Sequence, residues 1–121
     1  MGFPWQTQHP FHFWVHYRDQ YPEGNASMGV HEKEKISRNI GSDFTNRDGW
    51  RMYHELTIPG LLFHPHRGFE TITMNKEAFV DQTDSLGVAG RFGKVDVQWI
   101  TAGKGVQHAE IYPLCFRISK T

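Results

Sequence analysis

The amino-acid sequence predicts an all-β protein, either a barrel or a jelly roll. Its apolar segments are short, glycine-rich turns separate them, and no segment repeats with the period of an amphipathic helix. The chain has 121 residues, which is enough for one hydrophobic core. We therefore expect residues 1–121 to form a single domain.

The first half of the chain is expected to contain few strands. Residues 1–10 include two prolines and predict an extended leader, whereas the aromatic and β-branched residues 11–17 favour a strand. Residues 26–49 are polar and predict loops around a short strand. Within them, the alternating charges of residues 32–35 indicate a solvated loop or a helix end. A further strand is expected over residues 50–56.

The second half is expected to supply the main strands. Residues 62–75 predict two short strands on either side of a turn at Arg67 and Gly68. Residues 81–94 are rich in turn formers, and residues 95–100 return to a strand pattern. The glycines of residues 101–105 predict a tight turn before the last strand.

Two pairs of polar side chains fall on these strands at a spacing of two residues. Side chains at i and i+2 of a strand share one face, so His64 and His66 share a face, as do His108 and Glu110. A barrel that brings both pairs together would offer three imidazole nitrogens and one carboxylate oxygen. That set suits a divalent transition metal, and the alternative is a polar cluster without metal. The same alternation would turn three more side chains inward: Glu70, Ile72 and Met74.

Other candidate sites have weaker support. His12 and His16 would share a face of the first strand, either as a second metal site or on the surface, which is the commoner outcome. Lys104 lies between two glycines, but the remainder of a phosphate-loop motif is missing. Cys115 is the single cysteine, and we assign it no nucleophilic role.

Composition excludes several classes of protein. The 13 basic residues balance the 13 acidic ones, so direct nucleic-acid binding is disfavoured. One cysteine allows no internal disulfide and fits a reducing compartment. No apolar run approaches the ~18 residues that a membrane span needs. We expect a soluble cytoplasmic protein without membrane contact, which would also reach the nucleus if the source is eukaryotic.

Longer motifs around the histidines resemble the pirin family. They are His-Pro-His-Arg-Gly-Phe-Glu-Thr at residues 64–71, Asp-Ser-Leu-Gly at 84–87, Asp-Val-Gln-Trp at 96–99 and Thr-Ala-Gly-Lys-Gly-Val-Gln-His-Ala-Glu at 101–110. The resemblance extends from the N-terminus to about residue 113. It implies a cupin-type double-stranded β-helix, a jelly-roll barrel like the N-terminal half of the two-cupin pirins.

The resemblance also implies a metal site. The family's iron ligands fall on His64, His66, His108 and Glu110, and Glu70 would face inward and orient a histidine. The cofactor implied is Fe(II), although these ligand types also accept Mn, Co, Ni, Cu and Zn. Ala78 and Val95 depart from the family by replacing turn glycines, so their turns are expected to be distorted or differently built.

Three segments follow from this comparison with the family. Residues 1–40 would form a leader strand and loops, residues 41–112 the metal-binding barrel core, and residues 113–121 a divergent tail. Pirins continue with further strands and a second cupin, so the resemblance implies a truncated, incomplete barrel. We expect the face left open to support a homodimer, and light scattering after size exclusion that showed only monomer at micromolar concentration would contradict this.

Three functions are compatible with the resemblance. The first is a quercetin 2,3-dioxygenase-type enzyme acting on a flavonol-like aromatic substrate, with Glu110 as catalytic base. The second is a metal-dependent co-regulator that binds a protein partner, as eukaryotic pirins do with transcription factors. The third is an inactive fragment.

Overall fold

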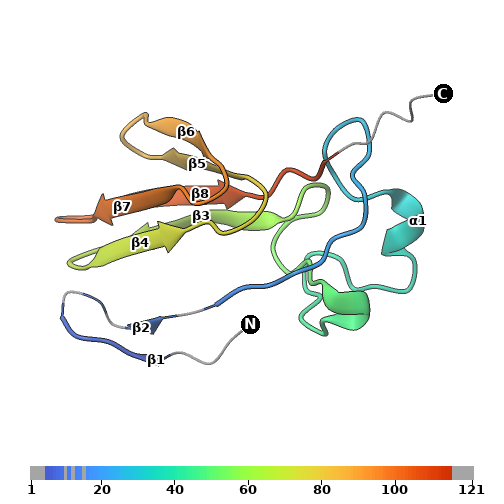
Figure 1. Ribbon diagram of the computed structural model, residues 1–121, viewed down its shortest axis with the longest axis horizontal. Coiled ribbons are helices and arrows are strands. Elements are labelled where there is room, and N and C mark those ends of the chain that lie inside the picture. The colour runs from blue at the N-terminus through green and yellow to red at the C-terminus, as the bar shows by residue number, and fades with distance from the viewer. Residues whose placement is uncertain (1–4, 10, 12, 15, 116–121) are drawn as a thin grey trace.

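The computed structural model describes residues 5–9, 11, 13–14 and 16–115, and within them the all-β prediction is confirmed (Figure 1). The strands gather at one end of the molecule, and the loops with the short helix α1 gather at the other. The elements in chain order are β1 (Trp5–Gln6), β2 (Phe13–Trp14), α1 (Glu32–Lys35), the 3-10 turn η1 (Arg47–Gly49), β3 (Gly60–His66), β4 (Glu70–Met74), β5 (Val80–Asp84), β6 (Ala89–Phe92), β7 (Val97–Thr101) and β8 (Val106–Ile111).

The largest sheet is antiparallel, with the strand order β3-β8-β5-β6. Along its edge strand β3, His64 pairs with His108 of β8, and a bulge shifts the register between Leu61 and His64. On the other side of β8, Gln82 of β5 pairs with Glu110. Strand β8, which carries His108 and Glu110, therefore lies between β3 and β5.

The second sheet consists of β4 and β7, and its faces are opposite to those the sequence predicts. Thr71 and Thr73 are half-buried, and the Thr73 hydroxyl reaches Glu110 of β8, so this face looks toward the larger sheet. The inward orientation expected for three side chains is wrong: Glu70, Ile72 and Met74 lie on the opposite face. The physical reason is the turn at Gly68 (φ 74°), which resets the alternation between β3 and β4.

The main apolar core lies beside the sheets and combines residues of an expected loop, an expected strand and the tail. Val30, Trp50, Met52 and Leu114 are buried together. Arg38 is buried over the Trp50 ring, with its guanidinium carbon 3.5 Å from the ring centroid, and it pairs with Asp43 at 2.9 Å. The guanidinium thus keeps its charge paired while it covers the core.

Several expected strands differ from the observed ones. Residues 50–56 form only an isolated bridge, between Met52 and Asp43, because Trp50 and Met52 pack into the loop core. Of residues 11–17, the described strand is Phe13–Trp14, and residues 12 and 15 lie outside the described part. Residues 81–94, expected as turns, hold most of the β5–β6 hairpin. Of the tail, residues 113–115 form no strand, and residues 116–121 lie outside the described part.

The charged segment Glu32–Lys35 forms the four-residue helix α1, which has no buried residue. A solvated loop or a helix end was expected here, and the structure has the helix. Among the described residues, no helix has the length and hydropathy that crossing a membrane requires.

The two turns that lack the family's glycines keep a left-handed backbone. Ala78 and Val95 have φ values of 63° and 64°, although a side chain disfavours this region, most of all when it is β-branched. Asn75 holds both turns, since its side-chain amide donates to the carbonyls of Ala78, Phe92 and Gly93. These hydrogen bonds explain how the conformation persists without glycine.

We predict that Val95→Gly raises the free energy of unfolding. Val95 is 80% exposed, so the change loses little packing, and relief of the left-handed strain is worth about 1 kcal/mol. Ala78→Gly should stabilise less, because an alanine side chain is less strained there. Urea unfolding measures both effects. Ala89→Gly in β6 is the control and should destabilise, and a loss of stability in Val95→Gly equal to the control's would contradict the account.

Candidate metal centre

Three histidines converge because β3 and β8 are paired. His64 and His66 share a face of β3, and His108 projects from the neighbouring strand. The ring centroids are 4.4 Å apart for His64 and His108 and 4.6 Å apart for His66 and His108. One ring nitrogen from each residue lies within 4.8 Å of the other two. The sequence prediction that these three imidazoles share one space therefore agrees with the structure.

Backbone and side-chain acceptors orient two of the rings. Nδ1 of His64 lies 2.7 Å from the carbonyl oxygen of Leu62, and Nδ1 of His108 lies 3.1 Å from Oε1 of Gln82. Both partners are acceptors, so each Nδ1 carries the proton and donates. The lone pair of each ring is then on Nε2, the atom available to a metal.

The arrangement of His66 fits a metal ligand. Its Nε2 lies 2.8 Å from Nε2 of His108, and its Nδ1 is buried without a hydrogen-bond partner. Two nitrogens bound to one metal ion at about 2.1 Å and at right angles would be about 3 Å apart, close to this separation. The donor set of three imidazoles is thus already gathered at a spacing that suits a transition metal.

Glu110 is buried next to this group but is not part of it. Its carboxylate is held by Gln82, whose Nε2 donates to Oε1 over 2.5 Å, and by the Thr73 hydroxyl at 3.5 Å. Its role as a metal ligand or base stays a prediction. Glu70 was expected to orient a histidine, and this is wrong: its Oε2 instead accepts from Trp99 at 2.6 Å and Thr101 at 2.7 Å on the opposite face of β4 and β7.

The site favours neutral imidazoles. Burial, together with a smaller effect of the neighbouring His64, lowers the pKa of His108 to about 4, and Asp84 opposes the shift. Burial also lowers the pKa of His66, with contributions from His108 and His64. Neutral rings are the form that binds metals, so the site's electrostatics and its geometry point to the same chemistry.

Three tyrosines lie close enough to Glu110 for its charge to affect their ionisation. Burial is the main cause of a raised pKa at Tyr17, Tyr53 and Tyr112, to about 12 for Tyr53, and the Glu110 carboxylate raises all three. Their hydroxyl groups therefore stay protonated at neutral pH.

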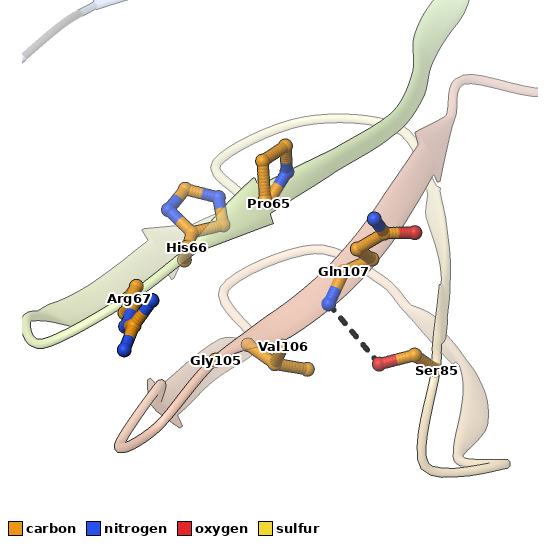
Figure 2. Close-up of a pocket in the computed structure, with 7 residues that line it drawn as sticks. All are labelled: Pro65, His66, Arg67, Ser85, Gly105, Val106 and Gln107. Atoms are coloured by element: carbon orange, nitrogen blue, oxygen red, sulfur yellow. Dashed lines mark hydrogen bonds between the residues drawn. The ribbon is translucent and has the colours of Figure 1, made fainter.

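An open hollow of about 310 Å³ adjoins the cluster and has His66 in its wall (Figure 2). Its other lining residues come from the ends of β3 and β8 and from the β5–β6 turn, where the Ser85 hydroxyl accepts from the backbone of Gln107. A smaller cavity of about 70 Å³ lies between β5, β6 and β7, lined by His108, Gln82 and Gln98 among others.

The remaining histidine candidates are dispersed. His9, His16 and His54 are exposed and His31 is half-buried, while His12 lies outside the described residues. Gln82 is the functional residue that sequence reasoning missed. The turn formers of residues 81–94 predict turns at this position, whereas the alternation of Val80 and Gln82 with Asp81 is the signal that places Gln82 on the buried face of a strand.

Comparisons with known proteins identify the family. The sequence model described as Pirin matches residues 3–115. The chain is 50% identical over 58 residues to a Pseudomonas aeruginosa protein named "Putative quercetin 2,3-dioxygenase PA2418", covering 48% of this chain and 20% of that protein. It is 38% identical to a "Pirin-like protein" of Solanum lycopersicum over 80 residues, covering 63% of this chain and 28% of the relative.

Human "Pirin" is 35% identical over 82 residues, covering 64% of this chain and 28% of the human protein. The chain thus matches between a fifth and little more than a quarter of the length of these relatives. Among solved structures there was no significant match. The family match and the antiparallel sheets together confirm the cupin-type fold that the sequence predicts. The family model extends over nearly the whole chain, which therefore belongs to the pirin family.

Proposed function

We propose that this chain is a non-haem Fe(II) protein of the pirin type. The observation that carries the proposal is the three-histidine group, in which His64 and His108 present Nε2 and Nε2 of His66 lies 2.8 Å from that of His108. Glu110 would complete the set by turning one carboxylate oxygen toward the histidines. Imidazole and carboxylate ligands also accept other divalent transition metals, so iron rests on the family resemblance.

The activity we propose is the oxygenation of a flavonol-like aromatic substrate, as the name of the Pseudomonas relative suggests. Bound Fe(II) would supply the redox chemistry with dioxygen. The chain itself would hold the substrate at the hollow beside His66, whose volume of about 310 Å³ is near the lower limit of small-molecule sites. Glu110 would take the proton of the substrate hydroxyl, while the protonated tyrosines near it would donate hydrogen bonds.

Oxygen consumption with a flavonol tests the activity. The iron-loaded protein should consume oxygen, and Glu110→Gln should lose at least about tenfold in rate while it retains metal, because an amide is not a base. Turnover unchanged in Glu110→Gln would eliminate the proposed base. A folded, iron-loaded protein that consumes no oxygen would instead favour the non-enzymatic co-regulator.

Metal content after anaerobic reconstitution with Fe(II) tests the site itself. We expect about one iron per chain, because three preoriented imidazoles bind one divalent ion. His108→Ala should lose the iron, since it removes the ligand that Gln82 orients. The matched control is His54→Ala, which removes an exposed histidine outside the group and should retain iron. Equal iron in His108→Ala and the control would contradict the site.

The stability of the metal-free protein should fall as the pH is lowered from about 6.5 toward 4. The pKa of His108 is about 4 in the folded chain, against about 6.5 when unfolded, so the unfolded chain takes up the proton first. Above pH 6.5 the ring is neutral in both states and contributes no pH dependence. Urea unfolding at pH 7 and pH 5 measures the loss, which should be smaller in His108→Gln. An identical loss in that variant would show that His108 is not the cause.

A further inference from the structure

Gln82 occupies a position from which it contacts two of the four predicted ligands. It lies on β5 directly opposite Glu110 of β8, two residue pairs away from the pair that contains His108. Its side chain is buried, with 3% of the residue exposed. A buried amide must satisfy its hydrogen bonds within the protein, so its partners fix its orientation.

Glu110 determines which end of the Gln82 amide donates a hydrogen bond and which end accepts one. An ionised carboxylate only accepts, so it requires the NH₂ group of Gln82, and Nε2 indeed lies 2.5 Å from Oε1 of Glu110. The amide oxygen is then turned to His108, 3.1 Å from Nδ1, which must carry the proton. The lone pair of His108 is consequently on Nε2, 2.8 Å from His66.

The same contact selects one oxygen of Glu110. Gln82 and Thr73 both donate to Oε1. The second oxygen, Oε2, is therefore the one that can turn to a metal while Oε1 keeps its donors. A carboxylate anchored through one oxygen and ligating through the other is a common arrangement at metal centres.

We propose that Gln82 is the positioning residue of the metal centre: its amide fixes His108 as the Nδ1–H tautomer and anchors Glu110 through Oε1. The inference rests on the proposed metal site. It also accounts for the function that the sequence wrongly gave to Glu70, because the residue that orients a histidine is on β5. Gln82 does not touch the substrate or the metal, and it acts through His108 and Glu110.

The first test uses the metal-free protein. Nitrogen-15 NMR of the imidazole rings distinguishes the two neutral tautomers at pH 7.5. We expect His108 in the wild type to be in the Nδ1–H form, and Gln82→Leu to shift it toward the Nε2–H form that isolated imidazole side chains prefer. Gln82→Glu should keep the Nδ1–H form, because a protonated carboxyl group at this position donates to Glu110 and its carbonyl oxygen accepts from Nδ1 of His108. The same tautomer in Gln82→Leu as in the wild type would overturn the proposal.

The matched control is Gln98→Leu. Gln98 is the same residue type, lies on β7 and lines the same small cavity, but its Oε1 has no hydrogen-bond partner. It should leave the His108 tautomer unchanged. If Gln98→Leu moved the tautomer as far as Gln82→Leu does, the effect would come from the cavity and the positioning role would be wrong.

The second test is a titration with Co(II), whose visible spectrum reports its ligands. Gln82→Leu should weaken binding about 10- to 100-fold, the range for loss of a residue that orients a metal ligand, and Gln98→Leu should not. Equal affinity in the wild type and Gln82→Leu would overturn the positioning role. If the wild-type protein binds neither Co(II) nor Fe(II), the proposed metal function is wrong. The tautomer measurement still decides whether Gln82 orients His108. If Gln82→Leu fails to fold by circular dichroism, Gln82→Met replaces it in both tests.

Discussion

The antiparallel pairing of β3 with β8 is the constraint on which the candidate site depends. It places His64 opposite His108 and His66 opposite Val106, so three imidazoles share one face of two adjacent strands. Because side chains alternate along a strand, a slip of one residue would turn these rings to the other face. The hydrogen bonds of the ladder thus set the positions of the rings.

Hydrogen-bond acceptors on and next to the paired strands determine the tautomer of two of the rings. The Leu62 carbonyl and the Gln82 amide oxygen accept from Nδ1 of His64 and His108, which leaves both lone pairs on Nε2. Burial keeps His66 and His108 neutral. Neutral imidazoles whose lone pairs face one another without enough hydrogen-bond donors are costly to bury, and a bound cation would offset that cost.

The sequence could predict that His64 and His66 share a face because the i, i+2 rule needs only local strand geometry. That His108 joins them depends on the β3–β8 pairing, which the sequence indicated only through its resemblance to the pirins. The sequence prediction is wrong at Glu70, because strand alternation does not continue through the Gly68 turn, where the chain passes from one sheet to the other. It failed at Gln82 because the aspartates and glycines of residues 81–94 favour turns, and the pairing of Val80–Asp84 with both β6 and β8 makes this segment a strand. At Ala78 and Val95 the sequence indicates strained turns but not their left-handed backbone, which depends on contacts of the Asn75 side chain, two of them with the distant Phe92 and Gly93.

The central claim is that the imidazoles of β3 and β8 bind one metal ion together. X-ray absorption at the iron edge of the Fe(II)-loaded protein tests it most directly, because imidazole rings give a distinct multiple-scattering signal. The account predicts about three histidine nitrogens at about 2.1 Å from the iron, with oxygen ligands completing the shell. A shell of oxygen ligands with one imidazole or none would contradict it.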